Sequence, residues 1–246
     1  MGATTLTNSH VLWDQWDLAP FTGQLDTAAS CAVRDANHLA GLGFSIMLPG
    51  LVSAVASIGG HADYAADAVD AVFASASRGR QELVTVIPNG TAHAAGDAAI
   101  FVRGQLDAYR TQQGSVGDVA GFAASITGDT PAVYGVVGAP LAARSSTLTG
   151  DALQLGAVGT GPNGRTERLW CGLHVTAASG TNLAVSVQSD DSSGFGSPAA
   201  VTSFSTVSAV GWQWTSVAGP ITDDYFRVTA TIGSGSFTFA VVLGVW

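Results

Sequence analysis

The sequence of 246 residues contains no lysine, so its nine basic residues are all arginines. A chain without lysine has no P-loop lysine, no Schiff-base lysine and no pyridoxal site, which removes several classes of enzyme mechanism. Charged residues make up only 11% of the chain, whereas hydrophobic residues make up 47%. This composition indicates a globular protein whose surface tends to be covered by neighbouring molecules.

Cysteine and long apolar runs are also scarce. Cys31 and Cys171 are far apart, and each lies in an alternating apolar run, so we expect buried free thiols rather than a disulfide or a metal pair. Residues 1–18 lack the basic and apolar regions of a secretion signal. Pro49, glycines and serines interrupt the apolar stretches, so we expect no membrane insertion.

Acidic side chains outnumber basic ones, with a formal net charge of −9. Residues 1–150 contain twelve acidic residues and six arginines, which gives −6 and leaves −3 for the remainder. A surface of this sign disfavours binding to a phosphate backbone and lets DNA pass without being held.

Glycine spacing gives one motif that resembles a cofactor site. Gly159, Gly161 and Gly164 match a dinucleotide fingerprint, but Pro162 interrupts it and a strand pattern follows where the fingerprint needs a helix. We therefore expect a hairpin turn there and no cofactor.

Two polar pairs are candidates for a metal. Asp190 and Asp191 could hold a calcium ion with backbone carbonyls, or they could be solvated turn residues. His61 and Asp63 are a weaker pair, and ordinary surface polarity accounts for them better. We predict no catalytic residue and no metal.

The first part of the chain predicts strands and one helix. Alternation predicts strands over residues 24–33 and 44–58, joined by a projecting loop from Arg34 to Gly43. Apolar residues at helical spacing predict one amphipathic helix over residues 64–77, closing one open end of a β-sandwich or barrel.

Residues 1–23 are predicted to form an extended arm. Trp13 and Trp16 would anchor it, and Pro20 limits regular structure. The arm packs either on its own domain or on a neighbouring subunit, and the sequence leaves both open.

A long hairpin follows a strand over residues 82–87. Its first strand covers residues 98–109, where Val102 and Leu106 belong to an apolar face and Arg103 and Asp107 to a mixed face. Its second strand is predicted over residues 116–127, followed by a shorter third strand.

The sequence pattern changes at residues 144–151, RSSTLTGD, which form the best linker candidate. A chain of this length suits two ordinary domains better than one. Short strands separated by Gly, Pro, Asp and Asn turns then predict an antiparallel sandwich, Ig-like or jelly-roll-like. The predicted strands cover residues 152–158, 169–177, 183–188, 200–205, 211–217, 225–232 and 237–245.

Tryptophans of this second half have two interpretations. Trp170, Trp212, Trp214 and Trp246 could stack on sugars, or they could pack in cores and interfaces. Strands favour aromatic residues in any case, so packing is the preferred interpretation.

The order of segments in the first half resembles the tail tube proteins of long-tailed bacteriophages. The resemblance is carried by LPGL at residues 48–51, VTVIPNG at 84–90, GDAAIFVRGQLDAY at 96–109 and SVGDVAGFAASITGD at 115–129. It implies that residues 1–148 form a tail-tube β-sandwich with one flanking helix, and that six copies close into rings that stack into a tube. Residues 149–246 resemble the β-sandwich decorating domain appended to some of these proteins.

The resemblance also implies roles for particular residues. Arg34, Asp35, Asn37 and His38 would lie in the loop that reaches the next ring, and the long hairpin would contribute Asp107 to the lumen. A solvent-exposed or interface-paired carboxylate is the alternative for Asp107.

The implied function is structural rather than enzymatic. The partners would be other copies of the chain, other tail proteins at the tube ends, and DNA as passing cargo. The protein would reside in the virion tail after assembly in the host cytoplasm. A capsid decoration protein, or a virion protein that binds carbohydrate or a receptor, is the alternative.

Overall fold

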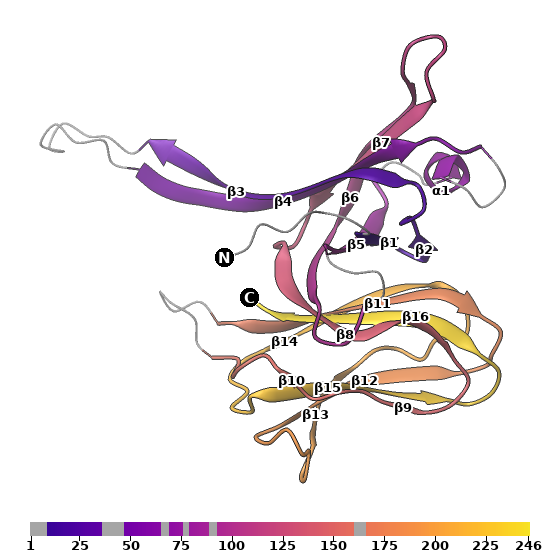
Figure 1. The fold of residues 1–246 in the computed structure, drawn as a ribbon. Helices are drawn as coiled ribbons and strands as arrows, with labels where there is room; N and C mark the ends of the chain where they lie inside the picture. The colour runs from indigo at the N-terminus through magenta and orange to yellow at the C-terminus, as the bar shows by residue number, and fades with distance from the viewer. Residues whose placement is uncertain (1–8, 36–46, 65–68, 76–78, 89–92, 160–165) are drawn as a thin grey trace, which may run out of the picture. The chain divides into compact units, whose positions relative to one another are not determined.

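The computed structural model describes residues 9–35, 47–64, 69–75, 79–88, 93–159 and 166–246 (Figure 1). The fold is all-β, as predicted, with sixteen strands and one short helix in this part of the chain. The chain divides into two compact units. Unit 1 comprises Met1–Thr22, Glu82–Phe101 and Val133–Trp246, and unit 2 comprises Gly23–Gln81 and Val102–Ala132.

Unit 1 contains an antiparallel sandwich. Buried side chains such as Leu173, Val185, Val228 and Val241 fill the space between its two layers. The first layer has the order β14 (Gly211–Ala218), β11 (Arg168–Ala178), β16 (Phe237–Val245) and β8 (Val133–Arg144). The second layer consists of β13 (Ala199–Ser203), β12 (Leu183–Asp190) and β15 (Tyr225–Ile232), with β9 (Leu148–Thr149) and β10 (Leu153–Gln154) both paired to β15.

Six of the seven strands predicted after residue 149 are confirmed to within two residues at each end. The strand predicted over residues 152–158 is shorter. It reduces to β10 and a single bridge between Val158 and Ile221. Gly156, which has a φ of +80°, breaks the extended backbone between these two points.

The predicted boundary between residues 148 and 149 falls inside unit 1. β8 pairs with β16 from Val136 to Arg144, and Leu148 and Thr149 of the predicted linker pair with Ala230 and Thr229 of β15. Strands from both sides of this boundary therefore contribute to the same sandwich. Independent folding of residues 149–246 stays a prediction.

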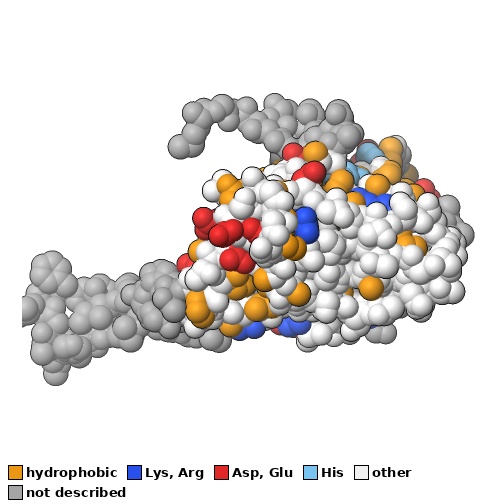
Figure 2. Space-filling model, turned by 90° about the horizontal axis from the view of Figure 1, so that it is seen from below, with side chains coloured by type: hydrophobic (Ala, Val, Ile, Leu, Met, Phe, Trp, Pro, Cys, Tyr) orange, Lys and Arg blue, Asp and Glu red, His pale blue; other side chains and the backbone are white. Residues whose placement is uncertain are grey.

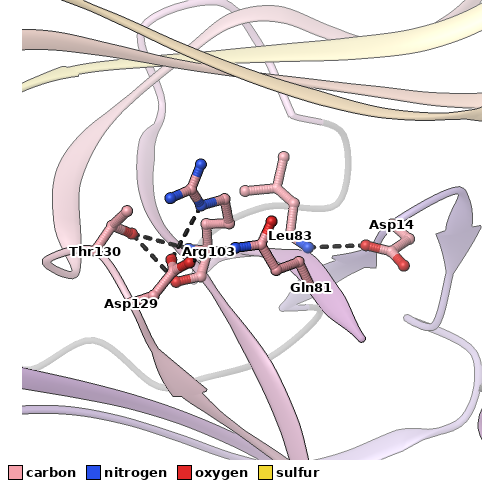
Figure 3. Close-up of polar contacts among 6 residues, drawn as sticks. All are labelled: Asp14, Gln81, Leu83, Arg103, Asp129 and Thr130. Atoms are coloured by element: carbon pink, nitrogen blue, oxygen red, sulfur yellow. Dashed lines mark hydrogen bonds and ion pairs between the residues drawn. The ribbon is translucent and has the colours of Figure 1, made fainter. Parts of the chain in front are cut away.

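The N-terminal segment is more regular than predicted. β1 (His10–Trp13) pairs with β2 (Trp16–Asp17) and with β5 (Gln81–Ile87), and Trp13 is fully buried. Asp14 closes the turn, because its Oδ1 accepts a hydrogen bond of 2.8 Å from the backbone N–H of Leu83 (Figure 3). Residues 10–17 therefore pack on their own unit, which is the first of the two alternatives for the arm, and consecutive apolar residues are buried there. Residues 1–8 lie outside the described residues.

Unit 2 is built on a four-stranded sheet with a helix against one face. The strand order is β3 (Thr22–Asp35), β4 (Met47–His61), β7 (Gly121–Gly128) and β6 (Ala98–Gln113). Phe73 of α1 (Val69–Ser75) stacks on Phe122 of β7, with ring centroids 6.1 Å apart, and on Tyr109 of β6 at 5.0 Å. The Tyr109 hydroxyl donates a hydrogen bond of 2.9 Å to Asp70. We call this side of the sheet the covered face.

The helix and the hairpin differ from their predicted limits. Tyr64 precedes α1, while residues 65–68 and 76–78 lie outside the described residues. The helix packs on a face of the sheet rather than closing an open end, because Phe73 finds its aromatic partners there. The second hairpin strand begins at Gly121 instead of residue 116, because Gly114 and Gly117 adopt positive φ angles and turn the chain.

The two thiols are free, but only one is buried. Cys171 lies in the sandwich core, whereas Cys31 is exposed on β3, contrary to the prediction. Residues 28–31 are all exposed, so the alternating sequence around Cys31 does not mark a buried face of the strand. No helix among the described residues is long and apolar enough to cross a membrane.

Candidate functional site

The uncovered side of the unit 2 sheet is the candidate functional surface, and we call it the polar face. Register places Ser57 of β4 opposite Ser125 of β7, and Thr127 of β7 opposite Gln105 of β6. The face carries small and hydroxyl side chains with few charges. Its members are Gln24, Asp26, Ser30, Ser53, Val55, Ser57, Gln105, Asp107, Ala108, Arg110, Ala123, Ser125 and Thr127.

Asp107 stands on this face, two residues after Gln105, and lies in a β-bulge. Leu106 pairs with Ile126 and Ala108 pairs with Ser125, so Asp107 is the extra residue of β6. A bulge re-aims the side chain of the inserted residue. The Asp107 carboxylate accepts hydrogen bonds from the hydroxyls of Ser125 and of Thr127, the latter at 2.7 Å.

These contacts keep Asp107 ionised. Partial burial acts to raise the pKa of the carboxyl, but the hydrogen bonds from Ser125, Thr127 and the backbone outweigh it. The pKa of Asp107 therefore lies below its usual range. The polar face thus carries a fixed negative charge here, with both oxygens held by the neighbouring strand.

A second polar cluster of unit 2 lies where β6 passes the segment after β7. The Arg103 guanidinium contacts Asp129 Oδ1 at 3.0 Å, and Gln81 donates to Asp129 Oδ2 at 2.7 Å (Figure 3). The Thr130 hydroxyl meets the backbone of Arg103 as both donor and acceptor. The charge of Arg103 is therefore offset locally, which leaves Asp26, Asp107 and Arg110 to set the charge of the described polar face.

A shallow hollow of about 160 Å³ lies on the polar face. It is lined by Ser57, Ala108, Arg110, Ala123, Ala124 and Ser125. Its lining contains no nucleophile–base pair and no group of carboxylates. The hollow thus presents small and hydroxyl side chains together with one guanidinium.

β3 and β4 continue beyond the sheet as a two-stranded ribbon. β7 pairs with β4 only from Val55 to His61, whereas β4 begins at Met47. Ala28, Ala29 and Ser30 are exposed in succession, so side chains on both faces of β3 are uncovered at these residues. Figure 1 shows the two strands running on together away from β7. We call residues 28–35 and 47–53 the ribbon.

Two of the residues predicted for the inter-ring loop lie in this ribbon. Arg34 and Asp35 belong to β3, so the loop predicted to begin at Arg34 begins later in the chain. β3, the strand that ends with these two residues, pairs with β4. Asn37 and His38 lie outside the described residues.

The acidic turn of unit 1 is organised by its own backbone. Asp190 accepts hydrogen bonds of 2.9 Å from the N–H groups of Ser192 and Ser197, and the bond from Ser197 lowers its pKa most. Contact with Asp190 raises the pKa of the Asp191 carboxyl. Both carboxylate oxygens of Asp190 thus accept hydrogen bonds from the backbone of the turn. Among the described residues, no group of three or more His, Cys, Asp or Glu side chains is arranged to hold a metal.

Charged side chains are sparse on the face that Figure 2 shows. This face is made mostly of uncharged side chains and backbone, and several acidic side chains gather in one patch on it. His61 and Asp63 of unit 2 are exposed, and among the described residues no further His, Cys, Asp or Glu joins them to form a group that could hold a metal.

Two of the tryptophans are packing residues. Trp170 and Trp214 lie with ring centroids 5.4 Å apart, and both pack against the buried cluster that contains Phe101 and Val242. The Arg168 guanidinium covers the Trp170 ring at 5.6 Å. The interpretation as packing residues is confirmed for this pair, while Trp246 is exposed.

No protein-family model matches the chain, and no curated protein matches it. A chain from the virion of a native gene transfer agent particle is 14% identical, with 54% of this chain and 98% of that chain covered and a TM-score of 0.38. The Dit protein of phage SPP1, titled a hub of the adsorption apparatus in phages that infect Gram-positive bacteria, is 10% identical over 97% and 99% of the two chains, with a TM-score of 0.38. A chain of the phage p2 baseplate in its activated conformation is 10% identical over 95% and 97%, with a TM-score of 0.30. Because these TM-scores are low, we base the proposed function on the residues of this chain.

Proposed function

We propose that the chain is a structural virion protein whose copies assemble into stacked hexameric rings, forming the tail tube of a long-tailed phage. Its partners are other copies of itself and the tail proteins at the tube ends. DNA passes through the tube as cargo, and no catalysis is involved. Residues 149–246 are proposed to decorate the tube.

The observation that carries this proposal is the uncovered ribbon of unit 2. A two-stranded ribbon alone in water is only marginally stable and needs a third strand or an apolar cover. The described ribbon has neither, and its exposed residues Ala28, Ala29 and Ser30 are small. β3 pairs only with β4 among the described strands, so its other edge is open to pairing.

Ring closure satisfies both needs of the ribbon. Pairing the open edge of β3 with a neighbouring copy removes the exposed backbone groups, and closed symmetry leaves no edge free. Small side chains allow a second copy to approach closely without displacing bulk. The scarcity of charge over the chain is also typical of a surface that packs against copies of itself.

The polar face is proposed to line the channel. Asp107 is held ionised there, and the formal charge of the chain is −9. A wall of this sign repels the phosphate backbone, so DNA slides past without being gripped. A density map of the assembled tube with Asp107 away from the channel would overturn this assignment.

Sedimentation velocity and negative-stain microscopy of the purified full chain test assembly. We expect rings or hollow tubes whose abundance increases with protein concentration. Ala28→Glu together with Ala29→Glu places charge on both faces of β3 and should abolish rings while leaving the unfolding curve unchanged. Ala200→Glu changes an equally exposed strand alanine of unit 1 and serves as the matched control.

Two outcomes would count against the proposal. The first is a wild-type chain that remains monomeric at every concentration and on prolonged incubation. The second is a ribbon double variant that assembles as well as the Ala200→Glu control.

A further inference from the structure

The turn between β6 and β7 presents two apolar side chains to solvent. Val116 is fully exposed and Val119 is 71% exposed. Exposed valines at the end of a long hairpin gain nothing for the isolated chain, because their apolar surface remains in contact with water. We call residues 114–120 the tip.

The tip is a fixed turn. The backbone N–H of Ser115 donates to Asp118 Oδ2 at 3.0 Å, and the N–H of Asp118 donates to the carbonyl of Ser115 at 3.0 Å. Gly114 and Gly117 have φ angles of +141° and +102°, which glycine tolerates best. A turn ordered in advance loses little conformational entropy when it docks.

Unit 1 carries an uncharged hollow beside the start of β14. Its volume is about 250 Å³. The lining has no charged residue, and it comprises Val175, Thr206, Val207, Ser208, Ala209, Val210, Gly211, Trp212 and Gln213. Such a volume admits two valine side chains, and the valines of the lining supply apolar contacts.

The hollow is also fixed before any contact. The Gln213 side chain accepts from the N–H of Ser205 at 2.7 Å and donates to its carbonyl at 2.9 Å. Val207 and Leu183 exchange two backbone hydrogen bonds of 2.9 and 2.8 Å. The loop between β13 and β14 therefore keeps its shape, and Val210 stands 44% exposed at the hollow.

We propose that the tip of one copy inserts Val116 and Val119 into this hollow of the next copy. This proposal rests on the proposed self-assembly and deepens it by naming the contact. Asp118 remains at the rim in solvent, since the hollow offers no cation. Tip and hollow are different surfaces, so the contact is head-to-tail, the type that generates rings or open stacks.

Cysteine cross-linking of the full chain tests the contact. We would prepare Val116→Cys and Val210→Cys separately, mix the two at a concentration where wild-type assembles, oxidise, and run a non-reducing gel. A covalent dimer is expected from the mixture, and a ladder of oligomers from the chain carrying both changes. Either variant alone controls for links through the exposed Cys31, and Tyr64→Cys mixed with Val210→Cys controls for random collision, because Tyr64 is exposed elsewhere on unit 2.

The critical concentration for assembly is a second measurement, which tests the contact even if the cysteines do not cross-link. Val116→Ser with Val119→Ser should raise the critical concentration for assembly at least about tenfold through lost apolar burial. The unfolding midpoint should not move, because both side chains are exposed.

The outcomes separate the two proposals. Wild-type rings without a dimer in the mixture, and with unchanged assembly of the serine variant, would overturn the tip contact alone. A tip-to-hollow dimer in particles that are neither rings nor tubes would support the contact and contradict the proposed tube. A wild-type chain that never associates would overturn both.

Discussion

His174 is expected to make unit 1 sensitive to acid. Its ring is fully buried, with Nδ1 2.6 Å from the carbonyl oxygen of Asp14 and Nε2 2.8 Å from the Thr85 hydroxyl. A carbonyl only accepts, so Nδ1 carries the proton and Nε2 accepts from Thr85. Burial lowers the pKa of His174 to about 4, although the contact with Asp14 acts to raise it.

The direction of the pH dependence follows from this shift. The unfolded chain binds a proton at His174 near pH 6.5, whereas the folded chain binds it only near pH 4. Stability is therefore greatest above about pH 6.5 and declines until about pH 4, by about 2 kcal/mol at pH 5 and about 3 kcal/mol at pH 4. Protons taken up only by the unfolded state account for this loss.

Urea unfolding of wild-type and His174→Gln at about pH 7.5 and about pH 5 measures the effect. Glutamine keeps one donor and one acceptor but does not titrate. We expect the variant to be less stable at the higher pH and to lose about 2 kcal/mol less than wild-type on acidification. His61→Gln, at an exposed position, should follow wild-type. Equal losses in wild-type and His174→Gln would refute the reasoning.

Three further changes test the packing of each unit. Phe73→Ala should destabilise unit 2 by about 3–5 kcal/mol in thermal unfolding, because the buried ring stacks on Phe122 and Tyr109, and an undiminished midpoint would contradict this. Gly135→Ala should cost about 1–3 kcal/mol or more, since a Cβ would lie 2.0 Å from the Leu243 carbonyl oxygen, whereas Gly196→Ala meets nothing within 4 Å and should be neutral. Asp107→Asn should lower stability at neutral pH, and this difference should vanish as the pH falls through the lowered pKa of Asp107, because the ionised form is the one held by Ser125 and Thr127. A difference that persists in strong acid would refute it.

Strands of the second half were predictable because their signals are local. β15 alternates apolar and polar residues and β16 is a short apolar run, both are bounded by turns rich in Gly, Pro, Ser and Asp, and the observed limits equal the predicted ones. The pairing of β8 with β16 was not predictable. It joins residues about a hundred positions apart, and periodicity carries no information about which strand lies alongside.

The long hairpin shows where alternation stops being informative. Val102 and Leu106 are buried, whereas Gln105 and Asp107 are exposed, as the pattern predicts. Phe101 is also buried, next to Val102, because the first part of β6 lies in unit 1, where Phe101 belongs to the buried cluster that contains Val242. A strand shared by two units changes its surroundings midway, and sequence alternation cannot mark that point.

The position of Asp107 on the mixed face was predictable, but the reason for its orientation was not. The sequence around residue 107 does not distinguish a bulge from regular pairing. The bulge is defined by the partners of Leu106 and Ala108, which are the consecutive residues Ile126 and Ser125 of β7. The hydroxyl partners Ser125 and Thr127 are likewise set by register.

The ribbon and the tip divide the proposed assembly between two kinds of force. The ribbon exposes small residues such as Ala28 and Ser30, so it offers backbone hydrogen bonds and close approach but little apolar area. The tip offers apolar area through Val116 and Val119 on a fixed turn, but no free strand edge. Backbone pairing is directional and the apolar contact is not. The ribbon would therefore set the register between neighbouring copies, while the tip would add affinity that does not depend on register.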